Sequence, residues 1–282
     1  MTRKTFILGL GAQKSGTTWL YHYLQAFDCV EFGMMKEYHI WDVRQDPQMF
    51  RIFNVDEGAL FRHRDKPRFP KLQLKYAMQN VDGFYGFYFQ NLLKNTGKTM
   101  TGDITPSYSA LTAKTLNAVK QELENSGFEV KVVFLMRDPV ERIWSSVRME
   151  RRIALNNGTD LATLGDEQTH VAQFYASPDA QVRTDYHRTI TNIEDVFTQE
   201  NIFYGIYEEL FTKQALEGFS RFLGVPMREE HLKLHVNITE KGTALPKALR
   251  RQMITHYADV YAFCRDRFPQ TRKLWQHGSA RL

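Results

Sequence analysis

The sequence contains little cysteine and no long apolar run. Its two cysteines, Cys29 and Cys264, lie far apart, so we expect free buried thiols rather than a disulfide framework or a short-spaced metal site. The first apolar run, Phe6–Leu10, is too short for a signal peptide or a membrane span. We therefore expect a cytoplasmic protein with no membrane span.

Internal repeats, low-complexity tracts and linkers rich in Gly, Ser or Pro are also absent. Their absence favours one domain over residues 1–282. Hydrophobic residues at 43% and charged residues at 24% are ordinary for a folded globular chain, which argues against disorder. A net charge of +5 is compatible with nucleic acid, an anionic membrane surface or a polyanionic small molecule, so the placement of the charges has to decide among them.

Apolar runs bounded by turn residues alternate with segments of helical periodicity. The runs predict strands over Thr5–Leu10, Lys98–Gly102, Val130–Met136 and Asn201–Ile206. Helices are expected over Thr17–Phe27, Ala113–Asn125, Val140–Arg151, Asp179–Thr198, Glu209–Leu223 and Pro246–Arg267. Such alternation predicts an α/β fold with a central parallel sheet flanked by helices. Gln45–Lys71 mixes charge with three prolines and is expected to be irregular.

The segment Gly11–Thr18 follows the first predicted strand and precedes the first predicted helix. A glycine-bounded loop in this position presents free backbone N–H groups to an anion at the helix N-terminus. Gly11 and Gly16 have the four-residue gap of a P-loop, but Thr17 stands where that motif has its lysine, and the basic residue is Lys14 inside the loop. The sequence therefore predicts a phosphate-binding loop that departs from the usual P-loop.

The predicted strand Val130–Met136 ends in Arg137 rather than in the carboxylate with which a nucleoside triphosphatase holds magnesium. A cation at this point favours direct binding of a second phosphate with no metal required. Two functional alternatives stay open here: a small-molecule or nucleotide kinase with a degenerate P-loop, and a non-catalytic nucleotide- or nucleic-acid-binding module. The structural alternative is a plain strand-to-helix turn.

Two separated motifs resemble those of sulfotransferases that use 3′-phosphoadenosine 5′-phosphosulfate. Lys14-Ser-Gly-Thr-Thr18 is similar to their 5′-phosphosulfate loop, and Arg137 followed by Ser145 is similar to their 3′-phosphate motif. The resemblance implies a P-loop-type domain in which Lys14 stabilises the leaving phosphate, adenosine 3′,5′-bisphosphate is the product, and no metal takes part. The implied donor-binding residues are Lys14, Ser15, Gly16, Thr17, Thr18, Arg137 and Ser145.

Lys36–Asp42 resembles the Glu-x-His-x-x-Asp segment of heparan-type sulfotransferases, which implies catalytic roles for Glu37 and His39 beside Lys14. In an extended stretch, Glu37 and His39 lie on the same side, because side chains alternate with a period of two. We expect Glu37 to be the base, with its basicity raised by burial or hydrogen bonding, and His39 is the alternative, since an imidazole titrates near neutrality. The structural alternative is a core histidine beside a surface ion pair.

Two further matches are shorter. Gly102–Tyr108 is similar to a strand end near the acceptor, which implies acceptor contacts for Tyr108 and for Asp42. Ile104 replaces a lysine of the family there, so a heparan-like acceptor is not carried over. Glu240–Thr243 is similar to the family's glycine loop over the nucleotide, except that a threonine replaces the usual arginine. Its candidate donor contacts are Lys241, Gly242 and Thr243.

The predicted reaction is in-line transfer of a sulfuryl group to a hydroxyl, or less favourably an amine, of a small molecule or glycan. No nucleic-acid partner is expected, and the oligomeric state is left open. Phe84–Phe89 is more typical of core packing than of an acceptor wall. Arg62–Arg68 is more typical of a solvated loop than of an anion site.

Overall fold

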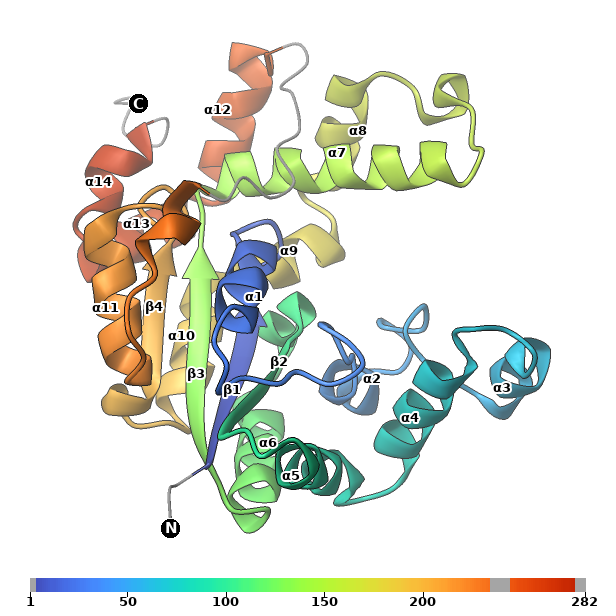
Figure 1. The fold of residues 1–282 in the computed structure, drawn as a ribbon. Helices are drawn as coiled ribbons and strands as arrows, with labels where there is room; N and C mark the ends of the chain where they lie inside the picture. Colours follow the sequence, from blue (N-terminus) through green and yellow to red (C-terminus); the bar gives the residue numbers. More distant parts are fainter. Residues whose placement is uncertain (1–3, 234–243, 277–282) are drawn as a thin grey trace.

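The computed structural model describes residues 4–233 and 244–276. The strands within these ranges form a four-stranded parallel sheet in the order β2, β1, β3, β4 (Figure 1). They are β1 (Lys4–Gly11), β2 (Met100–Ile104), β3 (Phe128–Met136) and β4 (Ile202–Ile206). In register, Leu8 of β1 lies opposite Asp103 of β2 and Val132 of β3. The predicted parallel α/β fold and its four strands are confirmed, and all carboxyl ends meet at one edge.

Alternate residues of β1 face two separate layers of helices. Phe6 and Leu8 contact the larger apolar cluster, while Ile7 contacts the other, and all three are fully buried. A strand covered on both faces requires this pattern. The Ile7 side is covered by α1 (Thr17–Gln25) and α11 (Lys213–Leu223). The other side is covered chiefly by α5 (Phe84–Thr96), α6 (Ala113–Asn125), α10 (Tyr186–Glu194) and α13 (Ala258–Arg267).

Local capping sets several helix ends. The bounds of α6 agree with the prediction, because the Thr112 side chain accepts a hydrogen bond from its first turn. Helix α11 begins at Lys213 rather than at Glu209, since Thr212 is its N-cap. Asp138 caps α7 (Pro139–Asn156), which runs five residues further than the sequence predicts.

Two of the predicted helices are wrong, because each is divided into two helices in the structure. Asp179–Thr198 is divided at Asp185 into α9 (Pro178–Thr184) and α10, and the Asp185 side chain caps α10 by accepting a hydrogen bond from Arg188 N. Pro246–Arg267 is divided at Tyr257 into α12 (Lys247–His256) and α13. Helical periodicity continues across both breaks, so periodicity alone does not reveal them.

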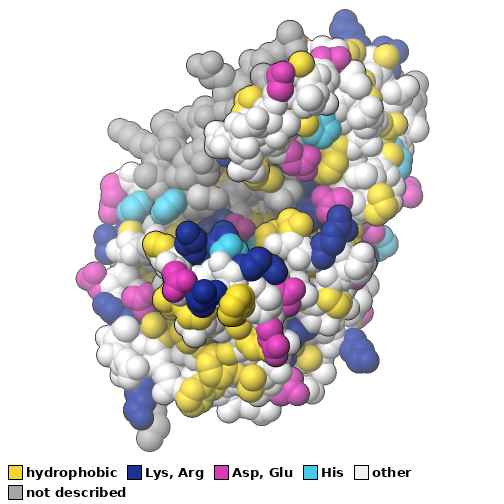
Figure 2. Space-filling model, turned by 90° about the vertical axis from the view of Figure 1, so that its right-hand side faces the viewer, with side chains coloured by type: hydrophobic (Ala, Val, Ile, Leu, Met, Phe, Trp, Pro, Cys, Tyr) yellow, Lys and Arg dark blue, Asp and Glu magenta, His cyan; other side chains and the backbone are white. Residues whose placement is uncertain are grey.

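The segment Gln45–Lys71 is more regular than predicted. After the short α2 (Trp41–Gln45), it contains α3 (Glu57–His63) and the start of α4 (Phe69–Asn80). The Asp56 side chain caps α3 by accepting a hydrogen bond from Ala59 N. In Figure 1, α3 and α4 project to one side of the sheet. Figure 2, viewed from that side, shows Lys and Arg side chains interspersed with hydrophobic ones.

The remaining elements complete the helical layers and the edges of the sheet. They are η1 (Pro106–Ala110), η2 (Leu161–Leu164), α8 (Glu167–Phe174), η3 (Gln199–Asn201), η4 (Glu229–Lys233) and α14 (Thr271–Leu274). Both cysteines are free, and the expectation of burial holds for Cys264 but is wrong for Cys29, which is half-buried. Among the described helices, none has the length and apolar character to cross a membrane.

Candidate functional site

A tight loop joins the end of β1 to the start of α1 at the carboxyl edge of the sheet. Gly16 ends this loop with φ +95°, and a Cβ there would lie 2.6 Å from Leu210 Cδ2, so glycine is required. Lys14 has φ 68°, a left-handed conformation that is uncommon for a residue with a side chain. Arg137 Nη1 donates to Lys14 O at 3.1 Å, which ties the loop to the end of β3.

A pocket open to solvent is lined by this loop, by residues that follow β2, β3 and β4, by the segments on either side of α2, and by α7 and α9. It brings together many of the predicted site residues: Lys14, Gly16, Thr17, Thr18, Glu37, His39, Arg137 and Ser145. Its other lining residues are absent from the predicted site: Gln13, Trp19, Lys36, Phe53, Pro106, Ser107, Met149, Arg183, Tyr207 and Phe211. The pocket therefore combines a phosphate-type loop with a pair of proton-accepting side chains.

The loop side of this pocket is strongly cationic. Burial, followed by the charges of three nearby arginines and Lys36, lowers the pKa of Lys14 to about 8. Arg137, which lines the pocket, buries its Nε without a hydrogen-bond partner among the described residues, and so do Ser15 (Oγ) and Arg148 (two nitrogens) outside the pocket lining. Buried donors and clustered positive charge fit a ligand that carries several negative charges.

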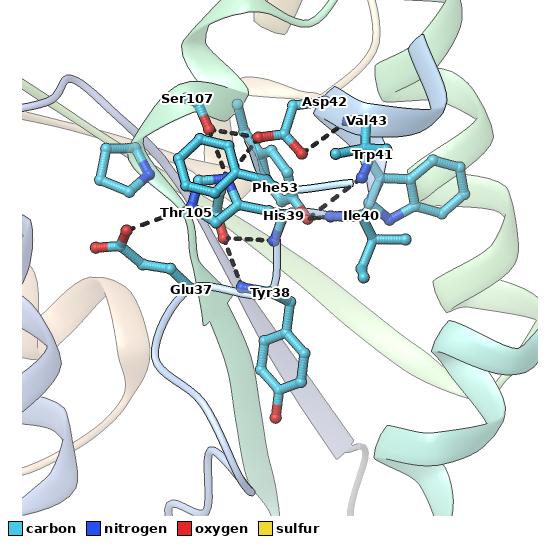
Figure 3. A network of polar contacts seen from close by, with 12 residues as sticks. Glu37, Tyr38, His39, Ile40, Trp41, Asp42, Val43, Phe53, Thr105 and Ser107 are labelled. Atoms are coloured by element: carbon cyan, nitrogen blue, oxygen red, sulfur yellow. Dashed lines mark hydrogen bonds and ion pairs between the residues drawn. The ribbon is translucent and has the colours of Figure 1, made fainter. Parts of the chain in front are cut away.

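Side chains that follow β2 hold the backbone of residues 37–42 (Figure 3). Thr105 Oγ1 accepts a hydrogen bond from Tyr38 N at 3.0 Å. Tyr108 OH accepts one from Ile40 N at 3.1 Å. These contacts satisfy backbone groups that have no partner in a helix or sheet, so the segment is fixed by side chains rather than by secondary structure.

Asp103 lies beneath this segment and joins its supports. The fully buried carboxylate accepts hydrogen bonds from Thr105 Oγ1 at 2.5 Å, Tyr108 OH at 2.8 Å, Tyr85 OH at 3.1 Å and Tyr38 N at 3.3 Å. Burial raises the pKa of Asp103 to about 6, although these hydrogen bonds oppose the rise. Because the Asp103 carboxylate binds the side chains that hold residues 37–42, the position of this segment depends on Asp103.

His39 is the centre of a second set of contacts. Its Nδ1 lies 2.7 Å from Asp42 Oδ2, and its Nε2 lies 3.5 Å from Glu37 Oε2. Ser107 Oγ donates to Asp42 Oδ2 at 2.5 Å, and the Phe53 ring stacks on the imidazole with centroids 3.5 Å apart (Figure 3). His39 has φ 55°, so Glu37 and His39 meet through a left-handed turn rather than through the predicted extended alternation.

Neighbouring side chains shift the pKa values of Glu37 and His39. Burial lowers the pKa of His39, but hydrogen bonds with Asp42 and Glu37 outweigh it, so the pKa is raised above its ordinary value. Burial raises the pKa of Glu37, but hydrogen bonds with His39 and Lys36 outweigh it, and the pKa falls to about 2. Glu37 therefore does not have the raised basicity expected of it as a base in this arrangement.

Lys36 connects the two sides of the pocket. Its Nζ donates to Glu37 Oε1 at 2.6 Å and to Thr18 Oγ1 at 3.1 Å. The side chain is 19% exposed and lines the pocket. The sequence places Lys36 only in a surface ion pair, because nothing local indicates that Thr18 lies within reach.

The amino-acid sequence matches the family described as sulfotransferase domain over residues 3–241. The chain belongs to the sulfotransferase family. It is therefore a sulfotransferase enzyme, and its family uses 3′-phosphoadenosine 5′-phosphosulfate as the sulfate donor. A comparison with curated proteins gave no match.

Solved sulfotransferase structures are similar to this sulfotransferase in fold. The sulfotransferase from Alicyclobacillus acidocaldarius has a TM-score of 0.56 at 17% identity, covering 98% of this chain and 100% of that chain. The sulfotransferase domain from the curacin biosynthetic pathway has a TM-score of 0.52 at 19% identity, covering 86% and 81%. Sulfotransferase STF9 from Mycobacterium avium has a TM-score of 0.51 at 15% identity, covering 95% and 77%. At these identities the similarity shows the fold alone.

Two predicted acceptor contacts lie behind the pocket of this sulfotransferase. Asp42 and Tyr108 are 0% and 1% exposed, and neither lines the pocket. Asp42 contacts His39 and Tyr108 holds the backbone of Ile40, so both support the site from within the protein. Three predicted donor contacts lie outside the described residues: Lys241, Gly242 and Thr243.

Several residues of the sulfotransferase pocket carry no strong sequence signal. Phe53 belongs to a segment predicted to be irregular, and Arg183 to a helix whose break is not visible in the periodicity. Tyr207 directly follows β4, and the rule that ligands bind at the carboxyl ends of parallel strands points to it. Phe84–Phe89 supplies core residues as expected, and Arg62–Arg68 does not line the pocket.

Proposed function

We propose that this sulfotransferase takes its sulfuryl group from 3′-phosphoadenosine 5′-phosphosulfate and transfers it to a hydroxyl, or less favourably an amine, of a small molecule or glycan. The observation that carries this proposal is one pocket in which an electropositive loop meets the Glu37–His39 pair. The loop offers charge complementarity to the donor, and the pair offers a proton acceptor beside it.

The 5′-phosphosulfate is assigned to the amino end of α1. Backbone N–H groups of Gly16, Thr17 and Thr18 lie where a helix N-terminus favours an anion. Ser15 belongs to the same loop, but its hydroxyl is fully buried and does not line the pocket. Lys14 lines the same pocket and is assigned to the phosphate that leaves.

The 3′-phosphate and the adenine are assigned to the neighbouring part of the pocket. Arg137, with its buried Nε, and Ser145 fit the 3′-phosphate. Trp19, Tyr207 and Phe211 line the pocket and offer aromatic surface for the adenine. Because Arg137 rather than a carboxylate follows β3, we propose that donor binding needs no metal.

Glu37 is assigned as the proton acceptor. The donor supplies an activated sulfuryl group, whose sulfur–oxygen bond to the phosphate breaks as the acceptor oxygen bonds to sulfur. The Glu37 side chain lines the pocket and is 36% exposed, whereas the His39 side chain is 7% exposed and its Nδ1 contacts Asp42. Glu37 is therefore the group that can reach an acceptor proton, and His39 with Asp42 orients it.

The donor assignment is tested by calorimetry and thermal shift with adenosine 3′,5′-bisphosphate, with ATP plus magnesium, and with a single-stranded oligonucleotide. Specific ligands stabilise the folded state, so only the bisphosphate should raise the melting temperature and bind at one site. Binding of ATP plus magnesium alone would contradict the proposal. A screen of phenols, alcohols, amines and glycans with labelled donor then identifies the acceptor.

A further inference from the structure

Lys36 is held between the donor loop and the proton acceptor. Its backbone oxygen accepts a hydrogen bond from Ile104 N at 3.1 Å, which anchors it to the end of β2. From this fixed point its ammonium reaches Thr18 Oγ1 at 3.1 Å and Glu37 Oε1 at 2.6 Å. The ion pair is shorter than the contact with the hydroxyl, so Glu37 is its principal partner here.

We propose that Lys36 couples donor binding to the readiness of Glu37, because the donor's phosphosulfate and the Glu37 carboxylate compete for the same ammonium. This inference rests on the proposed function. With the donor at the loop, Lys36 is shared with the phosphosulfate oxygens and its hold on Glu37 weakens. Glu37 then accepts a proton more readily at the moment when the sulfuryl group is in place.

The hydrogen-bonding capacity of Lys36 permits this sharing. An ammonium has three donors, and the structure shows two of them engaged, with Thr18 and with Glu37. The side chain lines the pocket, where the donor is proposed to bind. Glu37 is the only carboxylate among the described residues that line this pocket, so a phosphosulfate introduces a second, more highly charged competitor.

The other charged groups around Glu37 are less free to respond. His39 is fixed by Asp42 and by stacking on Phe53. Lys75 on α4 interacts with Glu37 through space only, and it is not part of the pocket lining. Lys14 belongs to the loop itself. Lys36 is thus the neighbour of Glu37 that touches both halves of the site, and part of the depression of the Glu37 pKa comes from it.

A double-mutant cycle on donor affinity tests the coupling without any acceptor. The dissociation constant of 3′-phosphoadenosine 5′-phosphosulfate is measured by calorimetry for the wild type, Glu37→Gln, Lys36→Met and the double variant. We expect Glu37→Gln to tighten donor binding about tenfold, because Lys36 loses its competing partner, and Lys36→Met to weaken it about tenfold. In the Lys36→Met background, Glu37→Gln should change the affinity by less than about twofold.

An equal gain from Glu37→Gln in both backgrounds would overturn the inference, because it would reflect removal of a negative charge and nothing specific to Lys36. In a Lys36→Arg background, Glu37→Gln should still tighten donor binding, since the guanidinium keeps the positive charge. If Lys36→Met does not fold, Lys36→Gln is used in its place. Lys71→Met on the exposed face of α4 is the matched control and should leave the affinity unchanged. Failure of the wild type to bind adenosine 3′,5′-bisphosphate would instead contradict the proposed function.

Discussion

The loop side and the catalytic side of the pocket differ in how completely their buried polar groups are satisfied. On the loop side, Ser15, Arg137 and Arg148 bury polar atoms that have no partner among the described residues. On the catalytic side, Asp103 accepts four hydrogen bonds and Asp42 is engaged by His39 and Ser107, although Trp41 Nε1 is buried there without a partner among the described residues. Unsatisfied donors cost stability until an anion binds, whereas a satisfied network holds its geometry beforehand.

This difference separates what each side contributes to the protein. Substitutions on the loop side should change ligand affinity more than the free energy of unfolding. Substitutions behind the catalytic side should change the free energy of unfolding more than donor affinity. Glu37 lies where the two sides meet. Substitution of Glu37 should change turnover more than it changes donor affinity or the free energy of unfolding.

Glu37→Gln should have the largest effect. We expect turnover with an acceptor from the screen to fall about 10²- to 10⁴-fold, because the amide cannot take the acceptor proton. Adenosine 3′,5′-bisphosphate should still bind, and calorimetry beside a steady-state assay separates the two quantities. Glu124→Gln on the exposed face of α6 is the control. Turnover retained within a few-fold would remove Glu37 as the proton acceptor and leave His39.

Asp103→Ala should lower the free energy of unfolding by about 3 kcal/mol or more, because it leaves several buried donors without an acceptor. Urea denaturation measures this loss. Tyr108→Phe removes one hydroxyl from the same network and should cost about 1 to 2 kcal/mol. If either variant weakened bisphosphate binding more than it destabilised the fold, the division between the two sides would be wrong.

The pH dependence of bisphosphate binding should report on Lys14. Its pKa in the free protein is lowered to about 8, and a bound polyanion raises it, so binding above this pH must be accompanied by proton uptake. Affinity should be nearly constant between pH 7 and 8 and then fall by up to about tenfold per pH unit as pH rises. Calorimetry across pH 7 to 9.5 measures the fall. Lys14→Met should bind weakly at all pH values, and a fall of the same size in that variant would assign it to another group.

Ser145→Ala should have the smallest effect. Loss of one hydroxyl should weaken binding of adenosine 3′,5′-bisphosphate by about five- to tenfold, within the range of a single hydrogen bond. Adenosine 5′-monophosphate lacks the 3′-phosphate, so its affinity should be the same for the variant and the wild type. Equal losses for both nucleotides would place Ser145 away from the 3′-phosphate.

Features that depend on local sequence could be predicted from it. The strand, loop and helix around Gly16 follow from apolar patterning and from a backbone conformation that only glycine adopts there. The bounds of α6 follow from the Thr112 cap. The convergence of Lys14 and Arg137 follows from their positions after β1 and β3 of one parallel sheet, whereas the place of Glu37 beside them follows from the family motifs.

Features that depend on distant contacts could not be predicted. Phe53 stacks on His39 only because the segment before α3 folds back over the site. The low pKa of Glu37 depends on hydrogen bonds with His39 and Lys36, whose positions are fixed by contacts with residues at and after the end of β2. The break at Asp185 is a local feature, because the Asp185 side chain accepts a hydrogen bond from Arg188 N, but the helical periodicity continues across it and conceals it.

The hydrogen bond from Arg137 to the Lys14 carbonyl has a consequence for the order of folding. The loop after β1 is closed by a residue 123 positions later in the chain, at the end of β3. Contacts of such long range form late, since loop closure must precede them. During synthesis, a nascent chain that stops before Arg137 has both glycines and the lysine of the loop but lacks the hydrogen bond from Arg137 that holds the loop. We therefore expect the nucleotide to be captured after the sheet has assembled, and not to act as a template for its assembly.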